Sequence, residues 1–163
     1  MKIVVTGALG HIGSRLIRDL PDAFPGSEII MIDNMLTQRY CSLFNLPESG
    51  RYQFIEADIT QIELDPFLQG ADVVVHLAAI TDATGSFEIS EKIENNNFNA
   101  TKRVAKACVE AGTRLITPSS TSVYTPHSDW VDENCHEQEL KPQSPYAITK
   151  LKEEGLINQL VNE

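Results

Sequence analysis

Short runs of apolar and β-branched residues alternate along this chain with longer segments whose apolar positions recur at helical spacing. Five short runs have the length of a β-strand: Lys2 to Thr6, Glu28 to Asp33, Tyr52 to Ala57, Asp72 to His76 and Arg114 to Pro118. Helices are expected at Ile12 to Leu20, Cys41 to Leu46, Ile62 to Leu68, Phe87 to Ala111 and Tyr146 to Leu160. Because the strands are apolar on both faces, this alternation predicts an α/β fold, a doubly wound parallel sheet with helices on both faces.

Glycine and proline positions mark the ends of several predicted elements. Gly112 follows the long helix, where glycine commonly ends a helix. The segment from Thr125 to Pro145 contains three prolines and many polar residues, which predicts a surface loop over the carboxyl ends of the strands. No repeat, low-complexity tract or linker divides the chain, so we expect residues 1–163 to form one domain.

Charge and composition exclude several classes of partner. The 163 residues include 13 Lys and Arg against 23 Asp and Glu, and the formal net charge of −10 would repel nucleic acid and anionic membranes. The apolar stretches are far shorter than the roughly 20 residues that a membrane-spanning helix needs. Met1-Lys2 leads straight into a predicted strand and leaves no room for a signal peptide, so we expect a cytoplasmic protein. No metal site is expected, and three widely spaced cysteines are predicted to be reduced structural thiols: Cys41, Cys108 and Cys135.

A glycine-rich turn joins the first predicted strand to the first helix. Its residues at 7, 10 and 13 follow the pattern GxxGxxG, and His11 and Ile12 open the helix between the last two glycines. Gly7 permits the tight turn, Gly10 lets the backbone approach a pyrophosphate, and Gly13 lets the helix pack closely on the strand. The context predicts a dinucleotide-binding turn, with the backbone N–H groups facing the phosphates.

Acidic residues end the next two strands. Asp33, 20 residues after Gly13, can accept hydrogen bonds from ribose hydroxyls and would repel a 2′-phosphate, which favours NAD over NADP. Arg39 could weaken that preference, and Asp33-Asn34 could instead simply form a turn. Asp58-Ile59 follows the third strand, where a carboxylate and an N–H group would read the adenine or would N-cap a helix.

Tyr146 and Lys150 stand at positions i and i+4 of the last predicted helix, on the same face. A tyrosine hydroxyl is a poor base at neutral pH, but a fixed ammonium beside it stabilises the phenolate. The pair therefore has the chemistry of an acid–base catalyst. The hydroxyl residues of Ser119-Ser120-Thr121-Ser122 follow the fifth strand, at the edge of the sheet where doubly wound folds bind ligands.

Seven landmarks in order resemble the extended short-chain dehydrogenase/reductase family, the NAD-dependent sugar-nucleotide epimerases and dehydratases, and most closely its UDP-glucose 4-epimerase-like branch. They are the three glycines, Asp33, Asp58-Ile59, His76-Leu77-Ala78-Ala79, Asn97-Phe98-Asn99-Ala100-Thr101, Ser119 to Tyr124 and Ser144 to Lys150. The resemblance covers the whole chain.

The resemblance implies a role for each matching residue. Tyr146 would be the proton donor and acceptor, Lys150 would orient the nicotinamide ribose, and Ser120 or Thr121 would bind the substrate oxygen. Asn97, rather than its neighbours Asn95, Asn96 and Asn99, would support the active site. Residues Leu77, Ala78 and Ala79 would line the cofactor cleft, while His76 is expected to be a core histidine rather than a base.

Two departures from the family pattern bear on the reaction. Dehydratases of the family carry an Asp-Glu pair directly after the catalytic hydroxyl residue, but this chain has Thr121-Ser122, which disfavours elimination of water. Thr125 replaces the glycine that usually follows the Val-Tyr pair, so the family pattern does not assign a particular substrate. Family members are about twice as long, and their second half supplies the last strands and most of the sugar pocket. The resemblance therefore implies either the N-terminal half of a longer enzyme or a natural cofactor-binding half that works differently.

The leading hypothesis is therefore an NAD-dependent epimerase or oxidoreductase that acts on a nucleotide-linked sugar and forms a homodimer. One alternative is a threonine or polyol dehydrogenase of the same family, which would release NADH. A non-catalytic NAD-binding module is the other, although such a module has no need of Ser120, Tyr146 and Lys150 together.

Overall fold

The computed structural model describes residues 1–81, 87–124, 133 and 140–162. These residues group into two compact units. Unit 1 consists of residues 1–79 and 103–118, and unit 2 consists of residues 80–102 and 119–163. The long helix α3 (Phe87–Ala111) begins in unit 2 and ends in unit 1.

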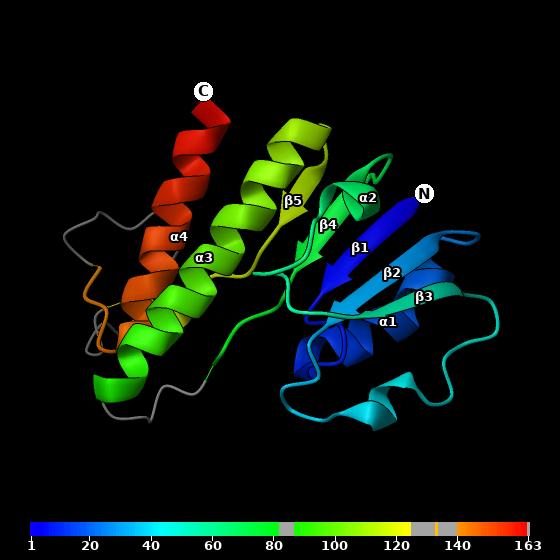
Figure 1. The fold of residues 1–163 in the computed structure, drawn as a ribbon, viewed down its shortest axis with the longest axis horizontal. Helices are drawn as coiled ribbons and strands as arrows, with labels where there is room; N and C mark the ends of the chain where they lie inside the picture. Colours follow the sequence, from blue (N-terminus) through cyan, green and yellow to red (C-terminus); the bar gives the residue numbers. More distant parts are fainter. Residues whose placement is uncertain (82–86, 125–132, 134–139, 163) are drawn as a thin grey trace. The chain divides into compact units, whose positions relative to one another are not determined.

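Unit 1 contains a parallel sheet of five strands in the order β3-β2-β1-β4-β5 (Figure 1). The strands are β1 (Lys2–Thr6), β2 (Glu28–Asp33), β3 (Arg51–Glu56), β4 (Val73–His76) and β5 (Arg114–Ile116). Ile3 pairs with Ile29 on one side and with Val73 on the other, so β1 lies at the centre. The predicted doubly wound parallel sheet is confirmed, with differences of one or two residues at the ends of the last three strands.

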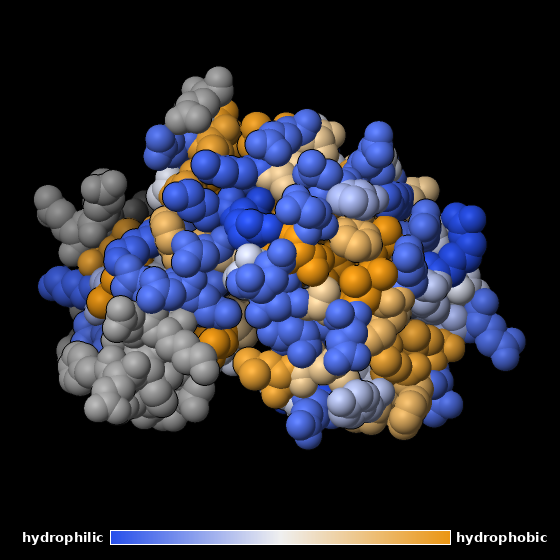
Figure 2. All heavy atoms as spheres, in the orientation of Figure 1, coloured by the Kyte–Doolittle hydropathy of each residue, from blue (hydrophilic) through white to orange (hydrophobic). Residues whose placement is uncertain are grey.

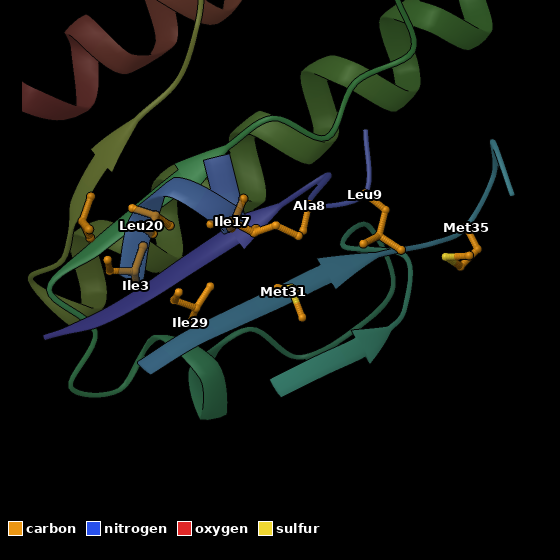
Figure 3. Close-up of a cluster of buried hydrophobic side chains, with 10 residues drawn as sticks. Ile3, Ala8, Leu9, Ile17, Leu20, Ile29, Met31 and Met35 are labelled. Atoms are coloured by element: carbon orange, nitrogen blue, oxygen red, sulfur yellow. The ribbon is translucent and has the colours of Figure 1, made fainter. Parts of the chain in front are cut away.

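The central strands are buried on both faces because helices cover both sides of the sheet. On one face, Ile3, Ile29 and Met31 pack with Ile17 and Leu20 of α1 (His11–Ala23) in one apolar cluster (Figure 3). The intervening residues Val4, Ile30, Ile32 and Val74 point to the other face and are equally buried. Figure 1 shows the C-terminal part of α3 on the opposite side of the sheet from α1.

Two short helices of unit 1 differ from the prediction. The segment expected over Cys41 to Leu46 is a single 3₁₀ turn, η1 (Tyr40–Leu43). Helix α2 (Asp65–Leu68) begins three residues later than expected because Pro66 suits the first turn of a helix, where no N–H bond is lost. Gly112 has a φ of 64° and follows the last residue of α3, as predicted.

Unit 2 contains the 3₁₀ turn η2 (Thr121–Val123) and helix α4 (Pro145–Asn162). Helix α4 starts close to the predicted Tyr146, with the Ser144 hydroxyl accepting a 3.1 Å hydrogen bond from the Ala147 N–H. Part of the predicted loop from Thr125 to Pro145, including Cys135, lies outside the described residues.

On the face that Figure 2 shows, apolar side chains are interspersed among polar ones. The exposed large apolar side chains of unit 1 include Leu36 and Phe44. Cys41 and Cys108 are free thiols, and burial raises the pKa of Cys108 to about 11. No helix of the described residues is long and apolar enough to cross a membrane.

Candidate functional site

The glycine turn between β1 and α1 has no room for side chains at two of its three glycines. Gly7 has a φ of 65°, and a Cβ there would lie 2.6 Å from the Ala78 nitrogen. A Cβ on Gly13 would lie 2.3 Å from the Gly7 carbonyl oxygen, so only glycine allows α1 to approach the turn this closely. At Gly10 the corresponding contact is a tight 3.1 Å.

The N-terminus of α1 is open to a ligand. Gly10 is its N-cap residue, no side chain caps the first turn, and that turn contains no acidic residue. His11 and Ile12 are exposed, and Ile12 is 61% accessible. Uncapped N–H groups and the helix dipole make such a terminus suitable for an anion such as a phosphate.

Asp33, the last residue of β2, is tied to the glycine turn. One carboxylate oxygen accepts a 3.0 Å hydrogen bond from the Leu9 N–H, and the other accepts a 2.9 Å bond from the Met35 N–H. The side chain of Asn34 accepts a similar bond from the Leu36 N–H. The turn-forming interpretation of Asp33-Asn34 is thus confirmed, and the carboxylate retains lone pairs for a ribose hydroxyl.

The residues after β3 form a turn that α3 holds in place. The Asp58 carboxylate accepts bonds from the N–H and hydroxyl of Thr60, at 2.8 and 2.7 Å. Burial acts to raise the pKa of Asp58, but bonds from Thr60 and the Asn34 side chain outweigh it and hold that pKa below its usual value. Arg103 of α3 donates to the carbonyl oxygens of Ile59 and Ile62 at 3.2 and 2.6 Å. Asp58 does not N-cap α2, because that helix begins seven residues later.

The segment after β4 packs directly on the glycine turn. Leu77 and Ala78 are the backbone that a Cβ on Gly7 would meet, and Ala79 follows them. His76 is 3% exposed and its Nδ1 lies 2.7 Å from the Thr6 hydroxyl, which agrees with the expected core histidine.

All these groups follow four neighbouring parallel strands, so they lie at one edge of the sheet in unit 1. A glycine turn without side chains, an uncapped helix and a carboxylate at the end of β2 fit a nucleotide with a pyrophosphate. The described residues contain no group of three or more His, Cys, Asp or Glu that could hold a metal ion.

The candidate acid–base residues belong to unit 2. Tyr146 and Lys150 lie one turn apart on α4, and the Lys150 ammonium is 5.8 Å from the centre of the Tyr146 ring. Tyr146 is half-buried, whereas Lys150 is only 4% exposed. The predicted helical pairing of these side chains is therefore present.

The hydroxyl residues near α4 are held by a network of their own. Ser120 is the N-cap of η2, and its hydroxyl lies 2.7 Å from that of Ser122. Ser119 donates to the Glu154 carboxylate of α4, which ties this segment to the helix. Ser120 is half-buried and Thr121 is exposed.

Asn97 differs from its asparagine neighbours in burial. It is 1% exposed, while Asn95 and Asn99 are exposed and Asn96 is half-buried. Its side chain bonds both backbone groups of Ile80: it accepts from the N–H at 2.8 Å and donates to the carbonyl at 2.9 Å. Asn97 therefore anchors the segment at Ile80 to α3 within unit 2.

Sequence reasoning missed three residues that hold this machinery: Arg103, Glu153 and Glu154. The two glutamates stand three and four residues after Lys150, which is the helical spacing at which side chains meet. That spacing was an available signal for Glu153, which pairs with Lys150, but not for Glu154, whose partner Ser119 lies 35 positions away. Arg103 acts across 41 and 44 positions of sequence, and no local pattern indicates such a contact.

A doubly wound parallel sheet with this glycine turn defines a nucleotide-binding protein of the α/β class. The chain matches the NAD dependent epimerase/dehydratase family over residues 3–162, and it belongs to that family.

Several similar proteins have names that refer to UDP-linked sugars. The chain is 34% identical to an uncharacterized UDP-glucose epimerase, YtcB, of Bacillus subtilis, over 96% of this chain and 50% of that protein. It is 33% identical to a UDP-glucose 4-epimerase of Mycolicibacterium smegmatis, over 99% and 52%. The structure resembles a UDP-glucuronic acid 4-epimerase of Bacillus cereus in complex with UDP-glucuronic acid and NAD, with a TM-score of 0.88, 33% identity and coverage of 100% and 53%. The chain thus spans about half the length of these relatives.

Proposed function

We propose that this chain is the NAD-binding and acid–base part of an enzyme that epimerises or oxidises a sugar linked to a nucleotide. The observation that carries the proposal is the Tyr146–Lys150 pair on α4, in a chain whose β1–α1 turn excludes side chains at Gly7 and Gly13.

The residues of unit 1 would hold the cofactor. Gly10 would let the pyrophosphate approach the backbone, although its own N–H donates to the Gly7 carbonyl. The N–H groups of His11 and Ile12 would bind the pyrophosphate, and Asp33 would accept from the adenosine ribose. Asp58 and Ile59 would contact the adenine, and Leu77, Ala78 and Ala79 would line the cleft. When bound, NAD supplies the redox chemistry as a reversible acceptor of hydride from the substrate carbon.

The residues of unit 2 would handle the proton. Tyr146 would take the proton of a sugar hydroxyl as that carbon is oxidised and return it when the carbonyl is reduced. Lys150 would stabilise the Tyr146 phenolate and orient the nicotinamide ribose, and Asn97 would support this geometry. Ser120, with Thr121 as the alternative, would bind the reacting oxygen.

Epimerisation or simple oxidation fits the chain better than dehydration. Eliminating water from the sugar needs a group that protonates the departing hydroxyl and a base that removes the neighbouring proton. Thr121 and Ser122 follow Ser120 and carry no carboxyl group. A substrate that is reduced again on its other face leaves as an epimer, and this outcome requires only the reversible chemistry above.

The proposal is tested with Tyr146→Phe in the full-length protein. Removing the hydroxyl should lower turnover of UDP-glucose or a related nucleotide sugar on the order of 10²–10⁴-fold. The fold and the affinity for NAD should barely change, because only a proton-transfer group is lost. Tyr40→Phe, on an exposed tyrosine of η1, is the matched control.

Product analysis separates the outcomes. An epimer without release of NADH supports the epimerase, whereas stoichiometric NADH in solution indicates a dehydrogenase. Normal turnover in Tyr146→Phe would assign the acid–base role to another residue. NAD binding without turnover of any nucleotide sugar by the wild-type protein would indicate a non-catalytic module.

A further inference from the structure

Helix α4 contains a buried ion pair that the proposed chemistry does not use. The Lys150 ammonium lies 2.8 Å from the Glu153 carboxylate, and the two side chains are 5% and 3% exposed. Glu153 is one helical turn after Lys150 and two turns after Tyr146. The same ammonium is the one that lies 5.8 Å from the Tyr146 ring.

A second lysine–glutamate ion pair involves the same helix, and its side chains are far more exposed than those of Lys150 and Glu153. Lys152 pairs with Glu94 of α3, but those side chains are 47% and 48% exposed, where water screens the charges. Burying an ammonium removes its hydration, and it keeps its charge there only with a close partner. Glu153 is the partner that the described residues provide.

The carboxylate of Glu153 is directed at Lys150. Its other oxygen, Oε1, is buried and has no hydrogen-bond partner among the described residues. A buried carboxylate commonly has several donors, so this single bond is unusual. Within the described part of the chain, Lys150 is therefore the donor that bonds this carboxylate.

We propose that Glu153 is a positioning residue for the acid–base pair: it keeps the Lys150 ammonium charged and fixed beside Tyr146. This inference rests on the proposed function of Tyr146 and Lys150. Glu153 acts through Lys150 and itself touches neither substrate nor cofactor.

The first test observes the lysine directly. In ¹⁵N-labelled protein, the side-chain ammonium of a buried, paired lysine exchanges its protons slowly with water and gives an NMR signal. Lys150→Arg assigns that signal. We expect Glu153→Gln to abolish it, because the amide keeps the size of the side chain but lacks the charge. Glu94→Gln, which removes the exposed partner of Lys152, should leave it unchanged.

The second test measures catalysis in the full-length protein. Glu153→Gln should lower kcat while the KM for NAD changes little, and Glu153→Asp should recover part of the loss. If Glu153 only stabilised the fold, its loss would not lower kcat at a nearly unchanged KM for NAD. The shorter acid in Glu153→Asp would then not restore kcat.

The outcomes distinguish the inference from the proposed function. An unchanged Lys150 signal in Glu153→Gln overturns the positioning role, whatever the activity. If Glu153→Gln abolishes the signal but the wild-type protein shows no turnover, the pairing is supported and the enzymatic proposal is contradicted. If Glu153→Gln does not fold, Glu153→Asp decides: proton exchange at Lys150 should be faster than in the wild type, and an unchanged rate overturns the inference.

Discussion

The carboxylate of Asp33 forms the turn that the sequence had presented as an alternative to ribose binding, and the proposed function adds ribose binding to it. It already accepts hydrogen bonds from Leu9 and Met35, which join the glycine turn to the end of β2. Its remaining lone pairs would accept from the ribose, as proposed. A short acidic side chain can serve both purposes because each carboxylate oxygen accepts more than one bond.

We predict that the wild-type chain binds NAD more tightly than NADP and that Asp33→Ser narrows the difference. The substitution removes the charge that repels a 2′-phosphate, and a change of about tenfold would correspond to ~1.4 kcal/mol of differential binding. Isothermal titration of both cofactors provides the measurement. Glu56→Gln is the control, since Glu56 is the register partner of Asp33 on β3. Equal or tighter NADP binding by the wild type would contradict the proposed role.

The glycines of α1 and α4 differ in whether the structure has room for a side chain at their position. At Gly13 in α1, a Cβ would overlap backbone oxygens of Gly7 and Ala8 at 2.3 and 2.7 Å. At Gly155 in α4, nothing lies within 4 Å of the added atom, and the residue is exposed. The first glycine is required by packing, whereas the second only adds flexibility to the unfolded chain.

We predict that Gly155→Ala raises the free energy of unfolding by roughly 0.5–1 kcal/mol, because alanine favours the helix. Gly13→Ala should lower it by about 1–3 kcal/mol, since the backbone must shift to admit the methyl group. Urea denaturation measures both. NAD affinity should fall only in Gly13→Ala, and an equal loss in both variants would show that the turn has no special role in binding.

The sheet of unit 1 ends at an uncovered edge among the described residues. Strand β5 pairs only with β4 there, and Ile116 at its end is 52% exposed. Val109 on the neighbouring part of α3 is 58% exposed. Unpaired strand edges with apolar side chains promote association between chains.

We predict that this 163-residue chain self-associates at micromolar concentration and shows no turnover alone, since it spans about half the length of its relatives. Sedimentation velocity should detect the association, and Ile116→Lys should shift it toward the monomer by placing a charge at the edge. Gly155→Ala can serve as the control variant. A stable monomer that turns over a sugar nucleotide would refute both parts.

The sequence alone determined the strands, the parallel α/β fold, the glycine turn and the spacing of Tyr146 and Lys150. These features depend on residues that are close in the chain, where apolar period and glycine placement act directly. The short helices were less predictable: the backbone after Asp58 forms a side-chain-stabilised turn, and α2 begins only at Asp65.

Only the tertiary structure decided which polar residues are buried. The run from Lys150 to Glu154 contains two lysines and two glutamates that look alike in the sequence, yet Lys150 and Glu153 are buried while Lys152 and Glu154 are exposed. Asn97 is likewise distinguished from its neighbours by its bonds to Ile80. Burial depends on which helix face meets other parts of the chain, and that depends on residues far away in the sequence.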